Sequence, residues 1–285
     1  MMRKLILTLF TITLTGLTNA QVTTPQPSPL SKTTQKVGMT TITVEYSRPG
    51  VKERTIFGDL VPYGELWRTG ANSNTKVTFD TEITIGEQVV AAGTYALFTI
   101  PNKDSWEFFF YKDSENWGLP KKWDDTKVAA KATGKAFPVP FNVETMAIDF
   151  NEIKSDRALL EIIWEKTYVS IPFHVPTEKI VMASIQKTMD ENPKVNDYYA
   201  AAVYYYETNH DINQAKKWID KAVKMQKKQP KFWVLRKQAL IHHKAGDTKS
   251  AIKAAKKSLE LAKEANNEAY VKMNEDSLIE WSVKL

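Results

Sequence analysis

A stretch in the first third of the sequence combines cationic, aromatic and amide side chains at close spacing. It reads YSRPGVKERTIFGDLVPYGELWRTGANSNT, residues 46 to 75, and contains Arg48, Arg54, Trp67, Arg68 and Asn72. A guanidinium group binds carboxylates through paired hydrogen bonds, an amide adds neutral hydrogen bonds, and an indole ring offers a stacking face. We therefore predict that these five residues bind a small polar or anionic ligand, for instance a sugar or a peptidoglycan fragment.

The same residue types also have a structural interpretation. In it, Arg68 is a buried strut that pairs with Glu45 or Glu65, because a buried pair costs about 3 to 5 kcal/mol to break. The aromatic residues would then fill the open end of a β-domain: Phe57, Tyr63 and Trp67. The structural interpretation is preferred for Trp67 and Phe57, and both interpretations stay open for Arg48 and Arg68.

Sequence signatures of catalysis are not found. The chain has no G-x-S-x-G, H-E-x-x-H, P-loop or G-x-G-x-x-G pattern. It also has no cysteine, which excludes disulfides, thiolate metal sites and cysteine nucleophiles. We therefore expect a non-enzymatic protein with no catalytic residues, no metal and no cofactor. Two alternatives stay open: a cell-envelope hydrolase in which Glu65 or Asp59 acts beside the arginines, and a purely structural scaffold.

The elements around this stretch have the period of β-strands. Apolar and polar residues alternate in residues 42–46 and 77–79, and the segments AGTYALFTIP and WEFFFYK form a predicted hairpin. Four more short strands are expected at residues 128–132, 145–150, 158–164 and 168–174. Eight to ten short strands indicate an antiparallel β-sandwich or jelly-roll-like domain over residues 35–176. Residues 21–34, rich in Pro, Thr, Ser and Gln, are predicted to be a flexible lead-in.

The period changes to that of helices after Pro176. Thr177 is expected to cap the first helix, and the rest is punctuated at Pro230, at residues 246–247 and at residues 266–267. A self-comparison at an offset of about 36 aligns two sets of mostly small residues: Ala215, Ile219 and Ala222 with Ala251, Ala255 and Ser258. This pattern resembles the tetratricopeptide repeat, so residues 177–285 are predicted to be a helical hairpin array that binds a protein or peptide partner. An ordinary helical bundle remains the alternative.

The first twenty residues have the composition of a signal peptide. Arg3 and Lys4 precede an apolar run from Leu5 to Leu17, and a small-x-small site ends at Ala20. We expect cleavage there, export to a periplasmic or extracellular space, and no membrane span afterwards, since the run is shorter than the roughly 20 residues that a span needs.

The formal net charge of +6 comes mainly from the second half of the chain. Residues 190–285 carry 18 Lys and Arg against 13 Asp and Glu. The cations are nearly all lysines at helix-surface spacing, which is typical of a solvated face and predicts no nucleic-acid partner.

The string RPGVKxRxIFG followed by VPYGxxWRTGAN, and then by AGTYALFTIP, resembles the signature of the secreted bacterial family catalogued as domain of unknown function 2911. The resemblance covers roughly residues 29 to 190. It implies an exported protein with a β-rich domain, commonly followed by helical repeats. It implies no catalytic residues, because no activity is established for the family.

Overall fold

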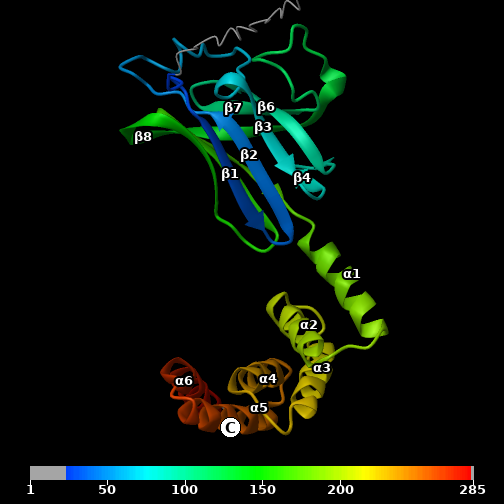
Figure 1. Ribbon diagram of the computed structural model, residues 1–285. Helices are drawn as coiled ribbons and strands as arrows, with labels where there is room; N and C mark the ends of the chain where they lie inside the picture. Colours follow the sequence, from blue (N-terminus) through cyan, green and yellow to red (C-terminus); the bar gives the residue numbers. More distant parts are fainter. Residues whose placement is uncertain (1–23, 284–285) are drawn as a thin grey trace, which may run out of the picture. The chain divides into compact units, whose positions relative to one another are not determined.

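The computed structural model describes residues 24–283, and the predicted signal peptide at residues 1–20 lies outside this range. The chain divides between Val175 and Pro176 into a β-unit and a helical unit (Figure 1). The predicted β plus α organisation is confirmed.

Nine strands of the β-unit form one antiparallel sheet in the order β1-β2-β3-β6-β7-β8-β9-β4-β5. Their bounds are β1 Leu30–Val37, β2 Thr40–Ser47, β3 Ala71–Phe79, β4 Ile83–Ile85, β5 Gln88–Val90, β6 Gly93–Pro101, β7 Ser105–Tyr111, β8 Val128–Asn151 and β9 Arg157–His174. Neighbours in this order are mostly neighbours in sequence, as in a meander. The exception is the β4–β5 hairpin, which attaches to β9.

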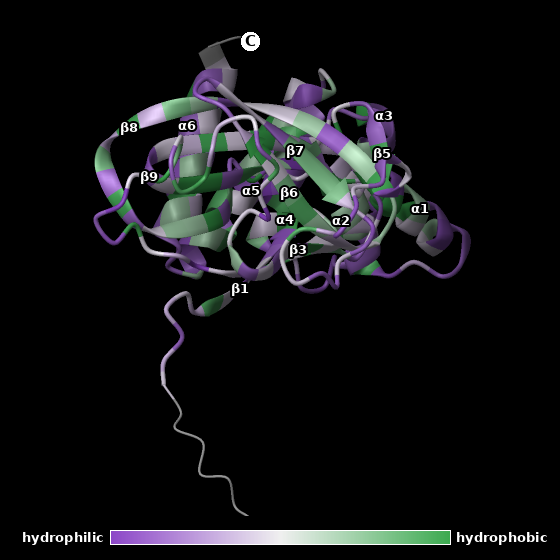
Figure 2. Ribbon diagram, turned by 90° about the horizontal axis from the view of Figure 1, so that it is seen from above, coloured by the Kyte–Doolittle hydropathy of each residue, from purple (hydrophilic) through white to green (hydrophobic). Residues whose placement is uncertain are grey.

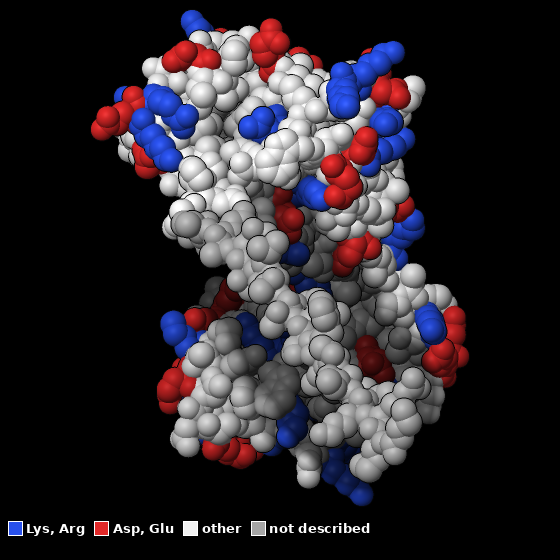
Figure 3. All heavy atoms as spheres, turned by 45° about the horizontal axis from the view of Figure 1, so that its top comes forward, with Lys and Arg blue, Asp and Glu red and all other residues white. Residues whose placement is uncertain are grey.

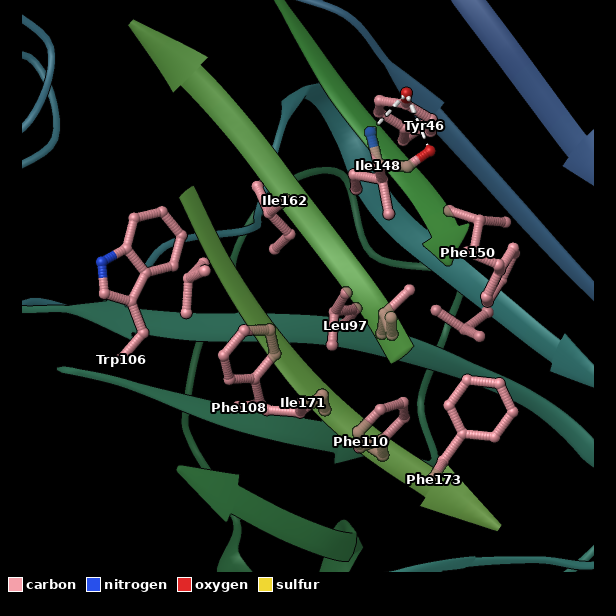
Figure 4. Close-up of a cluster of buried hydrophobic side chains, with 14 of the residues drawn as sticks. Tyr46, Leu97, Trp106, Phe108, Phe110, Ile148, Phe150, Ile162, Ile171 and Phe173 are labelled. Atoms are coloured by element: carbon pink, nitrogen blue, oxygen red, sulfur yellow. Dashed lines mark hydrogen bonds between the residues drawn. The ribbon is translucent and has the colours of Figure 1, made fainter. Parts of the chain in front are cut away.

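The sheet folds over its large core because its longest strand pairs with two different strands. The first part of β8, residues 128–135, pairs with β7, and the part from Ala136 to Asn151 pairs with β9. Trp106, Phe108 and Phe110 from β7 lie in one buried cluster with residues of β9, as Figure 4 shows: Ile162, Ile171 and Phe173. Inner faces that meet in this way are typical of a β-sandwich.

Alternation along the strands is confirmed where one face is buried. Ile42, Val44 and Tyr46 of β2 are buried, and the residues between them are partly exposed. The same alternation appears as changes of hydropathy colour along the strands in Figure 2. The Tyr46 hydroxyl accepts a hydrogen bond of 2.8 Å from the Ile148 amide, which ties β2 to β8 across the core (Figure 4).

Several strand limits differ from the predicted ones. Strand β1 begins at Leu30, inside the predicted lead-in, because an edge strand pairs through its backbone and needs no apolar face. The two strands expected at residues 128–132 and 145–150 are parts of β8, and those expected at 158–164 and 168–174 are parts of β9. Pro138 and Pro140 fall where the register of β8 shifts, so they bend the strand without ending it.

The helical unit contains six α-helices within the described residues: α1 Thr177–Asp190, α2 Val195–Glu207, α3 Ile212–Met225, α4 Phe232–Lys244, α5 Thr248–Glu264 and α6 Glu268–Val283. The three predicted breaks fall between helices. The capping prediction for Thr177 is wrong. Thr177 is the first helical residue, and Pro176 holds the cap position with no side-chain hydrogen bond.

The residues aligned by the 36-residue offset occupy equivalent buried positions. Ala215, Ile219 and Ala222 on α3 are fully buried, and so are their counterparts on α5: Ala251, Ala255 and Ser258. Helix α2 packs on α3, α4 on α5, and α5 on α6, so each helix contacts its neighbour in sequence. This burial fits a repeat, and the assignment to the tetratricopeptide class stays a prediction.

Charged side chains are mixed on the molecular surface. On the face that Figure 3 shows, Lys and Arg are interspersed with Asp and Glu. Within residues 24–283, no helix has the length and apolar character needed to cross a bilayer.

Candidate functional site

The turn from Trp67 to Asn72 has an unusual backbone held by buried hydroxyl groups. Thr69 and Asn72 have φ angles of 56° and 57°, and such a value is rare for a β-branched residue like threonine. The Thr69 hydroxyl bonds to that of Thr99 at 3.0 Å, and the Thr75 hydroxyl donates to the Thr69 carbonyl at 2.6 Å. These bonds hold a backbone conformation that costs about 1 to 3 kcal/mol in isolation. Strain of this kind concentrates at functional sites.

Gly70 is required at the tightest point of this turn. A Cβ atom there would lie 3.0 Å from the Thr75 Oγ1 and 3.2 Å from the Ser47 carbonyl oxygen, and the φ angle is 156°. Any side chain would therefore push the turn away from the end of β2. Close packing fixes the position of the residues on both sides of the glycine, Arg68 and Asn72.

Trp67 has the structural role. Its backbone exchanges hydrogen bonds of 2.8 and 2.9 Å with Thr99 on β6, and its indole Nε1 donates to the Gly70 carbonyl. The ring stacks against Trp164 at 6.0 Å and meets the edges of Phe57 and Trp106. Strands β7 and β9 contribute Trp106 and Trp164 to this cluster, so the Trp67 ring is used in packing.

Arg48 and Arg54 form hydrogen bonds with backbone carbonyl groups. The Arg48 Nε donates to the Met146 carbonyl of β8 at 2.8 Å. Arg54 donates to the carbonyl oxygens of Val51 and Gly50, within its own turn. Neither arginine contacts the other or Arg68 among residues 24–283, so the structure gives no contact that joins the three guanidinium groups.

Arg68 is different because its guanidinium group has no partner. Within the described residues it forms neither an ion pair nor a side-chain hydrogen bond, and its Nε is buried without a partner. The expected pairing with Glu45 or Glu65 is not present, since Glu45 lies 3.8 Å from Lys32 and Glu65 is exposed. The Nη1 atom lies beside Gly118, where a Cβ would stand 3.6 Å from it.

The loop at Gly118 is fixed to β3 by polar contacts. The Asn74 amide group donates to the Ser114 carbonyl at 3.0 Å, and its backbone amide donates to the Asn116 carbonyl. Lys76 pairs with Glu115 at 2.8 Å, and this hydrogen bond lowers the pKa of the Glu115 carboxyl group. These contacts hold the loop although its next residue, Trp117, is 78% exposed.

An open groove of about 650 Å³ lies between this loop, the turn and the segment that precedes β1. It is lined by Pro25, Gln26, Pro29, Leu30, Ser47, Asn72, Ser73 and Trp117. Asn72 is the one predicted site residue on its wall, and its side-chain amide donates to the Ser28 carbonyl and the Ser47 hydroxyl. Arg68 is not among the lining residues; its Nη1 lies beside Gly118, the residue that follows Trp117.

Trp117 is the groove residue that the sequence did not single out. It lies in the segment DSENWG, which draws attention to its acidic residues. A tryptophan next to a glycine in a polar loop is a usable signal, because tryptophan is seldom placed in such a loop without a contact to make. The segment lies about 50 residues from Arg68 in sequence, so only the fold brings the two together.

The residues expected for a hydrolase do not meet the arginines. Asp59 and Glu65 are both exposed, and in the described part of the chain neither forms an ion pair. Over the same residues, no group of three or more His, Cys, Asp or Glu could hold a metal ion.

Comparison with known proteins gives one result. The sequence model of the family described as protein of unknown function (DUF2911) matches residues 28–173, which is about half of the chain and nearly all of the β-unit. No curated protein and no solved structure matches. The chain therefore belongs to the DUF2911 family.

Proposed function

We propose that the β-unit is a non-enzymatic module that binds a small polar or anionic ligand in the groove beside the Trp67–Asn72 turn. The observation that carries the proposal is an exposed Trp117 ring on the groove wall, followed in sequence by Gly118, which lies beside the guanidinium group of Arg68; within the described residues that group has no partner. Both side chains sit on backbone that is held by buried hydrogen bonds, so the site is arranged before a ligand arrives.

The chemistry of these two residues defines the ligand class. An indole face stacks on the apolar face of a sugar ring or on another flat group, and a guanidinium group prefers a carboxylate. Asn72 and Ser73 add neutral polar atoms to the wall of the groove. A carboxylated sugar combines both features and is the ligand that the site suits best.

The test is a binding titration with carboxylated sugars and their neutral counterparts. Binding is monitored by tryptophan fluorescence and by calorimetry. We expect Trp117→Ala to abolish binding of both classes. Arg68→Gln should remove the preference for the carboxylated sugar, with a loss of roughly tenfold for one charged hydrogen-bonding contact.

Arg54→Gln is the matched control, because Arg54 belongs to the same stretch and bonds only within its own turn. It should bind as the wild type does. The proposal is wrong if no sugar of the panel binds, or if Arg68→Gln and Arg54→Gln affect the preference equally.

We also propose that the chain is exported and that its helical unit binds a protein partner. Support for export is the charged start, the apolar run and the small-residue site in residues 1–20. Support for a protein partner is the repeated burial of small residues on α3 and α5, since repeated helical hairpins present extended surfaces to other proteins.

A further inference from the structure

The turn between α3 and α4 carries a concentration of positive charge without acidic residues. Residues 221–246 contain eight Lys and Arg and no Asp or Glu. Four of these lysines line one open groove of about 610 Å³, together with three other side chains: Lys224, Lys227, Lys228 and Lys231, with Met225, Gln226 and Gln229. Half of the cations counted in residues 221–246 therefore line a single groove.

These four lysines are not neutralised within the molecule. None of them forms an ion pair or a side-chain hydrogen bond with a residue of the described part of the chain. Other lysines of the unit do have partners, such as Lys216 with Asp247 at 2.7 Å and Lys237 with Glu207 at 2.6 Å. The positive charge of the groove is therefore not balanced by acidic side chains, whereas the charges of Lys216 and Lys237 are.

The helix dipole accounts for only part of this charge. Lys224 lies in the last turn of α3, where a cation is favoured by about 0.3 to 1 kcal/mol. Lys227 and Lys228 lie beyond the end of α3, and Lys231 is the N-cap residue of α4, where the positive end of the helix dipole disfavours a cation. Within the described residues no acidic side chain offsets their mutual repulsion, and Lys231 has only a cation–π contact with the Trp233 ring.

We propose that this groove binds an acidic segment of a protein partner. The proposal deepens the inferred protein-binding role of the helical unit and is independent of the groove in the β-unit. The lysines supply charge complementarity to Glu and Asp, and Met225, which is 45% exposed, supplies an apolar contact beside them. The hollow shape fits a chain segment better than a flat bilayer surface.

A single-stranded nucleic acid fits this groove less well than an acidic peptide. Binding of bases needs a free aromatic face, and Trp233 is the neighbouring aromatic residue. The Lys231 ammonium group lies over its ring at 5.7 Å, and Phe232 packs against it at 4.9 Å. The Lys231 ammonium group thus covers part of one face of the Trp233 ring, which leaves less of it for a base to stack on.

The experiment measures binding of a short labelled peptide of alternating Glu and Leu to the full-length mature chain by fluorescence anisotropy. We expect saturable binding that weakens as salt is added, because contacts between exposed charges are screened. A variant with Lys224, Lys227, Lys228 and Lys231 all changed to Gln should bind at least roughly tenfold more weakly.

The matched control changes the same number of charges on α5, with Lys249, Lys253, Lys256 and Lys257 all replaced by Gln. These lysines are exposed on the same unit and outside the groove. The control should bind within about threefold of the wild type. Circular dichroism of both variants checks that the helices are intact.

Three outcomes would overturn the proposal. The first is an equal loss of binding in the two variants, which would mean that net charge alone attracts the peptide. The second is an absence of peptide binding by the wild type. The third is tighter binding of single-stranded DNA or of vesicles rich in anionic lipid, measured in the same way. None of these outcomes changes the result of the sugar titration, so the proposal for the helical unit and the proposal for the β-unit can be rejected independently.

Discussion

Arg48 and Arg68 lie on the same stretch of chain, yet their guanidinium groups meet different surroundings. Arg48 bridges β2 to β8 through a backbone carbonyl, and Arg68 has an Nε that is buried without a partner. A buried donor without an acceptor costs free energy, so the fold alone gives no reason to keep Arg68. At the scale of single residues, the difference separates a structural arginine from one available to a ligand.

The stability of two variants tests this difference. Arg48→Ala removes a charged donor from the Met146 carbonyl and should lower the free energy of unfolding by about 1.5 to 3 kcal/mol. Arg68→Ala removes no hydrogen bond and takes away a buried donor that has no acceptor, so it should leave this free energy unchanged or raise it. Urea unfolding followed by far-UV circular dichroism gives both values. If Arg68→Ala lowered the free energy of unfolding more than Arg48→Ala does, Arg68 would have a structural role and not a binding role.

The sequence was informative about residue types at the site and less so about their partners. It correctly favoured packing for Trp67 and Phe57, because large aromatic side chains near strand ends are usually buried. It left Arg68 undecided, since an unpartnered group is a property of three-dimensional surroundings. Trp117 was missed for the same reason, as exposure in a long loop has no periodic signal.

At the scale of elements, Asp247 connects the start of α5 with α3 and α4. Its carboxylate accepts a hydrogen bond from the Ser250 amide at the helix start and pairs with Lys216 at 2.7 Å. These hydrogen bonds, the one from Lys216 above all, hold the pKa of Asp247 well below its usual value. The carboxyl group of Asp220 also has a lowered pKa, because hydrogen bonds from His242 and Gln238 outweigh the opposite effect of burial.

These lowered values predict how the helical unit responds to acid. A carboxyl group whose pKa is lower in the folded chain stabilises it fully above its unfolded pKa, about 4 for Asp, and loses this contribution as the pH falls further. Asp247→Asn retains a capping side chain and loses the charge. The variant should therefore be less stable than the wild type at neutral pH, and the difference should shrink below about pH 4.

Unfolding by urea at several pH values, followed by far-UV circular dichroism, measures the effect. Asp276→Asn on α6 is the control, since among the described residues Asp276 pairs only with Lys272, one turn away at the helix surface. A constant difference between Asp247→Asn and the wild type across this pH range contradicts the prediction.

Element boundaries show where sequence patterns lose information. Three of the five breaks between the helices were predicted at the right places, because Pro, Gly and Asn end helices through local backbone preferences. Residues 30–34, the first part of β1, were predicted to be flexible, because this strand gains its order from backbone pairing with β2. The continuity of β8 and β9 depends on partners on both sides, which local residue types do not record.

At the scale of the whole chain, each unit has a hydrophobic core of its own. The large cluster of the β-unit uses residues from Val37 to Val175, and the clusters of the helical unit use residues from Tyr199 to Trp281. A unit that buries its own apolar residues has the means to fold alone. Family membership follows the same division, because the family match ends at residue 173.

Cutting the chain at this division tests the independence of the units. Fragments 24–175 and 176–285 are each expected to be folded, with strand and helix signals respectively, and to unfold cooperatively on heating. Circular dichroism and binding of a hydrophobic dye measure folding and exposed apolar surface. A fragment that binds the dye strongly and melts without a transition would show that its core depends on the other unit.

The β4–β5 hairpin sets an order of events during synthesis. Thr84 on β4 pairs with His174, the last residue of β9. The β4–β5 edge of the sheet can therefore form only after a residue about ninety positions further along the chain has been synthesised. Contacts between residues so far apart in sequence form slowly. A chain emerging from the ribosome therefore stays incompletely folded until almost the entire β-unit has been made. Under the export proposed above, this delay would keep the chain unfolded while the export machinery engages it.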